Sequence, residues 1–184
     1  IYNFWSRAYK HIYYANSVIK GVSESKSIST EDKNRLIGEA TVIRSILYYN
    51  LQQIFKEIPY TSSTDYNYNT KLRKYSKNEL LEQLQNDINQ VFPLLKEQYN
   101  NQERIFVNKK VAELLLAKVY MQKNRWDMAE QVLSDIIQSP LYVFETDVNK
   151  VFVKTGKHIL WQLKPANITD ATKEYHLFNF TLSI

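Results

Sequence analysis

Apolar side chains recur at intervals of three and four residues in five separate stretches of this chain, and that spacing places them on one face of an α-helix. We expect helices over residues 4–20, 31–55, 108–123 and 126–137, and a further one that starts after Ser76 and is kinked or ended by Pro93. Only three glycines and four prolines occur among the 184 residues, which is too few for a turn-rich β fold. The chain is therefore predicted to be mainly α.

Local signals mark the ends of these helices. Gly21 is expected to end the first helix, and Pro59 follows the second. Ser76 and Glu79 have the spacing of a capping box, which satisfies backbone N–H groups at a helix N-terminus. The last two helices are joined by so short a connection that they must form an antiparallel hairpin.

That hairpin carries the spacing of a tetratricopeptide repeat, in the order Ala117, Tyr120, Trp126, Ala129 and Leu133. The small alanines let the two helices approach closely, and the large aromatic side chains fill the space between neighbouring hairpins. We expect the first two helices to be a diverged copy of the same unit. Trp126 is predicted to lie on a buried face with Ala129, Leu133, Ile136 and Ile137, and Trp5 and Trp161 are also predicted to be core residues.

The pattern changes after Pro140, where short β-rich runs appear at residues 141–144, 151–153 and 159–163. We expect one or two short strands there. The sequence is accordingly divided into a tetratricopeptide-like helical region, residues 1–138, and a mixed segment, residues 139–184, of the same incomplete domain. The missing initiator Met and signal peptide indicate that the chain is part of a longer protein.

The titratable residues do not form a recognisable catalytic or metal-binding pattern. His11, His158 and His176 lie far apart in the sequence, and there is no cysteine. No glycine-rich phosphate motif occurs. We therefore predict no enzyme activity, no metal and no cofactor.

A basic cluster, Lys71, Arg73, Lys74 and Lys77, lies near several tyrosines and is compatible with a nucleic-acid backbone. The net charge is only +5, however, and the other basic residues are interspersed with acidic ones. Nucleic-acid binding is therefore not predicted.

Residues 60–75 show neither helical nor strand periodicity and are predicted to be a long exposed loop. Its candidate ligand-binding residues are Tyr60, Tyr66, Asn67, Tyr68 and Asn69. Flat aromatic faces beside amide groups suit sugar rings and their hydroxyl groups. The alternative is that these tyrosines only attach the loop to the helices. Arg44, in the second helix, is expected to anchor a carboxylate or a loop carbonyl, and contact with a ligand is the alternative.

Four sequence blocks together resemble the SusD/RagB family of outer-membrane nutrient-binding lipoproteins. They are WSRAYKHIYYANSVIK at residues 5–20, GEATVIRSILYYNLQQIFKEIP at 38–59, YSKNELLEQLQNDINQVFPLL at 75–95, and residues 111–137 with LLAKVYMQKNRWDMA. The second block resembles the family pattern GEA-x-x-x-RA-x-x-Y-x-x-L, which ends in a proline after an aromatic residue. One departure is Lys56, which stands where family members commonly carry glycine. Another is Lys157 with His158, where they commonly carry glutamate.

The resemblance implies a fold of tetratricopeptide-like hairpins with a short strand-containing C-terminal segment. It also implies non-catalytic binding of an oligosaccharide or other nutrient at the cell surface, and delivery to a SusC-like TonB-dependent transporter. Attachment to the outer membrane would use an N-terminal lipid anchor outside this chain. The rival hypothesis is a tetratricopeptide-like adaptor that binds a peptide or protein partner.

Overall fold

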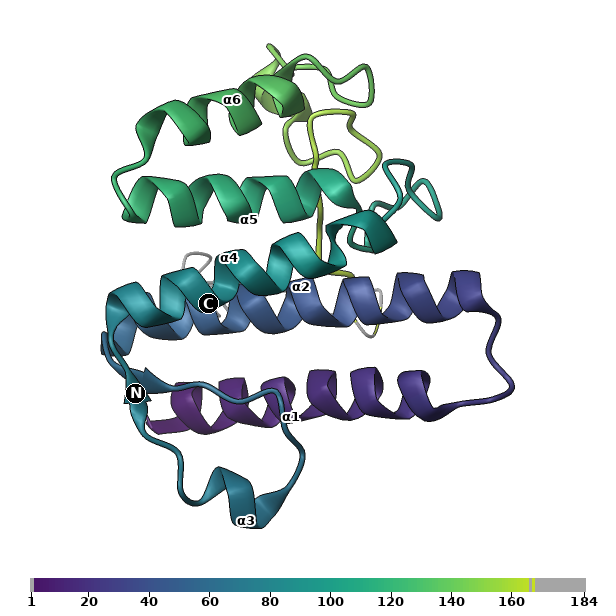
Figure 1. Ribbon diagram of the computed structural model, residues 1–184. Coiled ribbons are helices and arrows are strands. Elements are labelled where there is room, and N and C mark those ends of the chain that lie inside the picture. The colour runs from purple at the N-terminus through teal and green to yellow at the C-terminus, as the bar shows by residue number, and fades with distance from the viewer. Residues whose placement is uncertain (1, 166, 168–184) are drawn as a thin grey trace, which may run out of the picture.

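The computed structural model describes residues 2–165 and residue 167. The elements in chain order are α1 (Tyr2–Glu24), α2 (Thr30–Phe55), β1 (Ile58–Pro59), α3 (Tyr66–Asn69), β2 (Lys74–Tyr75), α4 (Lys77–Val91), a 3₁₀ turn (Phe92–Leu94), α5 (Lys109–Gln122), α6 (Trp126–Ile137) and a second 3₁₀ turn (Val148–Lys150). The long helices pack in the order α1, α2, α4, α5 and α6, so they form one stack with α1 and α6 at its two ends (Figure 1). The predicted mainly α fold is confirmed.

Side-chain caps explain where three of the helices begin. Ser29 accepts a hydrogen bond from the backbone N–H of Asp32 at the start of α2, and Asn108 serves the same purpose for α5. Ser76 and Glu79 form the predicted capping box at the start of α4. These caps confirm the helix starts expected from the sequence.

The prediction that Gly21 ends the first helix is wrong, because α1 continues to Glu24. Gly21 has no positive φ, and nothing lies within 4 Å of where its Cβ would be. A glycine in an exposed helical turn costs only about 1 kcal/mol relative to alanine. That cost is too small to stop a helix whose apolar face is packed against α2.

Helix α4 takes part in both apolar clusters of the core. Leu84 belongs to a cluster that α4 shares with α1 and α2 around Tyr48. Ile88, one turn further along, belongs to a cluster with α5 and α6 that includes Leu115 and Ala129. α4 therefore joins the two ends of the stack, and a change at its buried face affects the position of every long helix.

The hairpin of α5 and α6 is confirmed, and Ala117, Tyr120 and Ala129 are buried in it as predicted. Two residues of the predicted buried face are exposed instead, Trp126 at 58% and Ile137 at 78%. Among the described residues, the only long helix packed against α6 is α5, so only the stripe that faces α5 is covered. The burial of Trp126 predicted from the repeat spacing is thus wrong for this structure.

The predicted strands after Pro140 are also wrong, since residues 139–165 contain turns and one 3₁₀ turn but no strand. The strands within the described part of the chain are β1 and β2, which pair antiparallel with Ile58 opposite Tyr75. In residues 141–162 isolated backbone bonds, such as that from the Val143 N–H to the Lys157 carbonyl at 3.2 Å, do not continue into a ladder, and side-chain bonds hold much of the segment in place. Arg104, for example, donates to the Leu141 carbonyl at 3.0 Å, and Trp161 Nε1 donates to the Ile105 carbonyl at 2.9 Å. The predicted mixed segment continues into residues 168–184, which lie outside the described residues.

None of the helices in the described ranges combines the length and the hydropathy that crossing a membrane requires.

Candidate functional site

A buried ion pair holds the segment that carries the candidate tyrosines, residues 60–75, here called the tyrosine loop. Arg44 of α2 and Asp87 of α4 are both more than nine-tenths buried, and Arg44 Nη2 lies 3.0 Å from Asp87 Oδ2. Tyr60 donates its hydroxyl hydrogen to the same oxygen at 2.6 Å, and Gln83 Nε2 donates to Asp87 Oδ1 at 2.8 Å. The prediction that Arg44 anchors a carboxylate is confirmed. The first residue of the tyrosine loop is thus fixed to the centre of the helical stack.

Two further helical residues hold the next loop residue, Thr61. Asn16 of α1 accepts a hydrogen bond from Arg44 at 2.9 Å and donates to the Thr61 carbonyl at 3.2 Å. The hydroxyl of Tyr48 donates to the same carbonyl and accepts from the Thr61 N–H, both at 2.9 Å. Buried polar groups that are this fully bonded fix one arrangement of the backbone. The loop therefore leaves the stack in a defined direction.

Tyr60 is part of this anchor, because its side chain is only 7% exposed. Its ring centroid lies 4.8 Å from that of Tyr48 and 5.6 Å from that of Tyr75. Burial raises the pKa of the Tyr60 hydroxyl, and the neighbouring carboxylate of Asp87 adds to the rise. The hydroxyl therefore keeps its proton and stays a donor to Asp87.

The middle of the tyrosine loop forms the short helix α3, which lies at the α1 end of the stack (Figure 1). Asp65 caps it by accepting from the Tyr68 N–H at 3.0 Å. Tyr66 and Tyr68 are 77% and 58% exposed, and Asn67 between them is exposed as well. The sequence predicted an exposed loop with no regular structure. The exposure is confirmed for this middle part, but the loop has regular structure in α3 and at its end, where β2 pairs with β1 just before the loop.

Asn69 differs from the other candidates because its amide is bonded inside the loop. Its Oδ1 accepts from Thr61 Oγ1 at 2.7 Å, and its Nδ2 donates to the Ser63 carbonyl at 3.1 Å. The structure therefore places the five predicted residues in two groups. Tyr60 and Asn69 hold the loop together, and the others, residues 66–68, project from it.

An open cleft of about 530 Å³, here called the loop cleft, lies beside this projecting part. Its lining residues are Tyr60, Asn67, Tyr68, Lys71, Leu72, Arg73 and Tyr75. The cleft thus contains three tyrosine rings, two cations, and the side-chain amide of Asn67, for which the described residues show no hydrogen bond. The sequence predicted Tyr60, Tyr68 and Asn67 as site residues, but it considered Lys71 and Arg73 only for nucleic acid and did not assign Tyr75 to the site.

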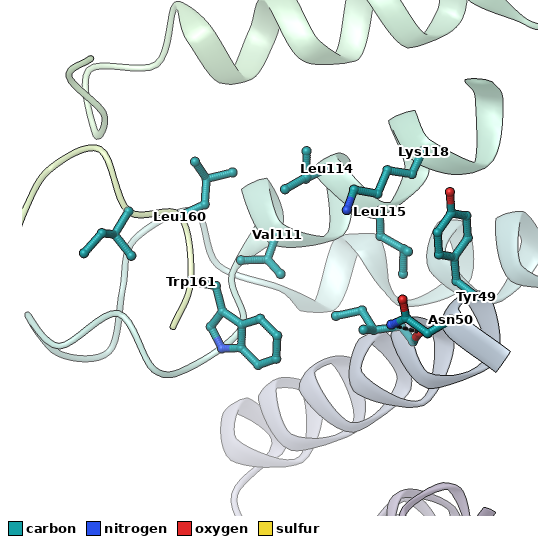
Figure 2. A pocket seen from close by; sticks show the side chains of 10 residues that line it. Tyr49, Asn50, Val111, Leu114, Leu115, Lys118, Leu160 and Trp161 are labelled. Carbon is teal, nitrogen blue, oxygen red and sulfur yellow. Dashed lines mark hydrogen bonds between the residues drawn. The ribbon is translucent and has the colours of Figure 1, made fainter. Parts of the chain in front are cut away.

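A second hollow, here called the Trp161 pocket, has a volume of about 260 Å³ and lies between α2, α5 and residues 159–161. Figure 2 shows the Trp161 ring below Val111 and Leu115, with Asn50, Tyr49 and Lys118 around the other side. The lining is mainly aliphatic. Sequence reasoning assigned Trp161 to the core and missed this pocket. The available signal was the pair Tyr49 and Asn50, a second aromatic–amide neighbour pair beside the apolar stripe of α2.

The described residues offer no metal site, since no group of three or more histidine, aspartate or glutamate side chains lies together in residues 2–165 and 167. The buried carboxylate of Asp87 is already bonded by three side chains. His158 contacts the Val151 carbonyl at 2.9 Å, His11 lies on the exposed side of α1, and His176 lies outside the described residues.

The comparisons with known proteins agree with this fold. A family model described as "Starch-binding associating with outer membrane", of the SusD-like type, matches residues 1–121. SusD-like protein P25 of Formosa agariphila is 25% identical over 163 residues, which are 86% of this chain and 31% of that protein. The chain thus spans about a third of the length of this relative.

Solved structures show the same arrangement of helices. A SusD-like protein from Bacteroides fragilis superposes with a TM-score of 0.77 at 16% identity, covering 90% of this chain and 34% of its own. A laminarin-binding SusD-like protein gives 0.73 at 19% identity, with coverages of 82% and 35%. Surface glycan-binding protein A from Bacteroides thetaiotaomicron, in complex with laminarihexaose, gives 0.72 at 19% identity, with coverages of 85% and 33%. At these identities the likeness establishes the fold.

Proposed function

This chain belongs to the SusD-like family, which is described as starch-binding and associated with the outer membrane, and from that premise we propose that it captures glycans at the cell surface without altering them chemically. The loop cleft is the proposed contact site. Two structurally similar proteins bind laminarin or its hexasaccharide. Delivery of the glycan to a SusC-like TonB-dependent transporter, and a lipid anchor outside this chain, complete the proposal and rest on family membership.

The observation that carries the proposal is the exposed ring of Tyr68 beside the amide of Asn67 in a cleft whose base is rigid. The CH face of a sugar ring packs against the flat apolar face of an aromatic ring, and an amide bonds to equatorial hydroxyls. Because Tyr60 and Thr61 are fixed by buried hydrogen bonds, little conformational entropy is lost when a ligand binds to this part of the loop. The site stays wet, so we expect weak to moderate affinity.

The rival hypothesis, a peptide-binding adaptor, has less support. It requires a groove lined by asparagine, lysine and arginine side chains that bind peptide termini. The loop cleft does contain Asn67, Lys71 and Arg73, but three tyrosine rings line it with them. Two structurally similar proteins bind laminarin or its hexasaccharide, which favours a glycan. The Trp161 pocket has a lysine at its edge but is otherwise mainly aliphatic.

The test is retention of the protein in gels that contain laminarin, starch or other polysaccharides. Replacing Tyr68 with Ala removes one stacking surface, and we expect a loss of about fivefold to tenfold in affinity for the retained glycan, corresponding to about 1 kcal/mol or slightly more. The matched control is Tyr14→Ala, which removes a similarly exposed tyrosine on α1. Tyr66→Ala tests whether the second projecting ring also contributes.

Two results would count against the proposal. If Tyr68→Ala and Tyr14→Ala retained glycan equally well, the loop cleft would not be the contact site. If no polysaccharide in a broad panel retarded the unmodified protein, while a peptide library yielded tight binders, the adaptor hypothesis would take its place.

A further inference from the structure

The loop cleft carries positive charge that stacking on a neutral sugar does not require. Lys71 and Arg73 line it together with Tyr68 and Tyr75, and no aspartate or glutamate does so. The Arg73 guanidinium carbon lies 4.6 Å from the centroid of the Tyr75 ring, so the guanidinium covers one face of that ring, whereas Tyr68 is 58% exposed. A ligand in this cleft therefore meets stacking surfaces and cations at the same time.

The carboxylates that flank this part of the loop already accept hydrogen bonds within the protein. Asp65 caps α3 through the Tyr68 N–H. Glu79 accepts from Arg73 at 2.8 Å and from the Ser76 hydroxyl at 2.8 Å. Hydrogen bonding to Arg73, followed by that to Ser76, lowers the pKa of Glu79 to about 2, so Glu79 stays charged and neutralises Arg73 only. Lys71 forms no ion pair with any of the described residues.

The positive charge extends past the cleft. Lys56, Lys74 and Lys77, with one carboxylate, that of Glu57, line a second hollow of about 640 Å³ beside the β1–β2 ribbon. Residues 56–77 contain five basic side chains and two acidic ones. At an ionic strength of about 0.1 M, charges interact over a Debye length of about 10 Å, so several of these cations contribute to the potential at the cleft.

We propose that the loop cleft takes an anionic glycan, one whose sugar rings carry carboxylate or sulfate groups. The inference rests on the proposed function, because it names the class of glycan for the same site. A sugar ring stacks on Tyr68, Asn67 bonds to its hydroxyl groups, and its anionic substituent lies against Lys71, with Arg73 as a second, partly neutralised partner. A neutral glucan fills the same cleft but leaves the Lys71 ammonium group in water.

A nucleic acid carries anions as well, but the arrangement favours a sugar. Single-stranded nucleic acids bind along an extended basic groove with several stacked bases. Here the cations and exposed rings surround one cleft, and the Asn67 amide suits vicinal hydroxyl groups, which a phosphate backbone lacks. Nucleic acid is therefore kept as an outcome of the test.

The experiment compares glycans that differ only in charge, using the full chain. One pair is polygalacturonate and its carboxyl-reduced form, and the other is a sulfated galactan and its desulfated form, so the two arms separate carboxylate from sulfate recognition. An exposed ion pair changes affinity by about twofold to fivefold. We expect the charged member of at least one pair to bind up to about tenfold more tightly at 50 mM NaCl. That advantage should largely disappear at 500 mM NaCl.

Substitutions then assign the effect to the cleft. Lys71→Gln should lower affinity for the charged glycan by about twofold to fivefold and leave the neutral partner unchanged. Lys118→Gln is the matched control, because it removes an exposed lysine at the Trp161 pocket. Tyr68→Ala should weaken binding of both glycans, since stacking does not depend on charge.

The possible failures are distinguishable. Equal affinity for charged and neutral glycans, with Tyr68→Ala still weakening both, would overturn this inference and leave the proposed function standing. Equal losses in Lys71→Gln and Lys118→Gln would show general attraction to polyanions and would also overturn it. Tighter binding of an oligothymidylate than of any glycan, with the same dependence on Lys71, would point to nucleic acid instead. Retention of no glycan at all would refute both proposals.

Discussion

The buried carboxylate of Asp87 offers the strongest test of how the tyrosine loop is held, and Asp87→Asn is the perturbation that isolates its charge. The side chain of Asn has almost the same shape as that of Asp. Its amide oxygen can take the place of Oδ2 and still accept from Arg44 and Tyr60, which lie at 3.0 and 2.6 Å. Its NH₂ group then faces Gln83, whose own amide can turn to accept. The substitution thus removes the negative charge and keeps the number of hydrogen bonds.

The magnitude follows from the burial of Arg44. Its side chain is 7% exposed, and its Nε has no hydrogen-bond partner among the described residues, so its charge depends on Asp87 for compensation. Removing one partner of a buried ion pair costs about 3–5 kcal/mol. Because Asn16 still accepts from Arg44 Nη1 at 2.9 Å, we expect the lower end, about 3 kcal/mol. For a chain of this size that corresponds to a fall in Tm of roughly 6–12 °C.

The assay is urea unfolding followed by circular dichroism at 222 nm, with the m value compared between variants. The matched control is Asp135→Asn, which alters an exposed aspartate on α6 and should change the free energy of unfolding by less than about 0.5 kcal/mol. A loss below about 1 kcal/mol for Asp87→Asn at an unchanged m value would refute the reasoning. It would mean that water reaches Arg44 and that the ion pair does not hold the loop.

Three other substitutions test local features of the chain. Glu79→Gln should lower the free energy of unfolding at neutral pH. The hydrogen bond from Arg73 chiefly lowers the pKa of Glu79 from 4.5 to about 2 in the folded state, so the difference from the unmodified protein should disappear as pH falls from about 4.5 toward 2. Parallel pH profiles of the urea midpoints of the two proteins would contradict this. Lys56→Gly should raise the free energy of unfolding by about 1 kcal/mol in urea titrations, since Lys56 has a φ of 65°, which favours glycine. An unchanged or lower free energy of unfolding would argue against backbone strain at Lys56. Gly38→Ala should lower Tm by a few degrees in thermal melts, because the new Cβ would lie 2.8 Å from Leu95 Cδ2 in the core. Overpacking costs about 1–3 kcal/mol, which exceeds the gain in helix propensity of about 1 kcal/mol. A higher Tm would show that the Leu95 side chain moves freely.

The helices were predictable because their signals are local. Periodic apolar residues, the cap at Ser76 and the proline at residue 93 act within a few residues of where they stand in the sequence. Lys56 illustrates the same point at one position. The family resemblance predicted glycine at this position, and the positive φ of Lys56 gives a physical reason why glycine would suit it.

The failed predictions share one cause, which is that periodicity identifies an apolar face but not its partner. Trp126 has the repeat spacing, yet no described helix covers its side of α6. The β-rich runs after Pro140 have strand composition, yet two of their carbonyls, those of Leu141 and Ile159, accept from the side chain of Arg104, which lies 37 and 55 residues away in the sequence. A strand needs a neighbouring strand, and composition alone does not supply one.

The same distinction separates two tyrosines that the sequence could not tell apart. Tyr60 and Tyr68 belong to one loop without periodicity in the sequence, but only Tyr60 lies within reach of Asp87, which is 27 residues further along the chain. Because a long-range contact decides which ring is buried, one tyrosine positions the loop and the other is left to face a ligand. Loss of the Tyr60 hydroxyl should therefore reduce stability first and glycan affinity only through movement of the loop. Loss of the Tyr68 ring should reduce affinity while leaving the unfolding free energy nearly unchanged.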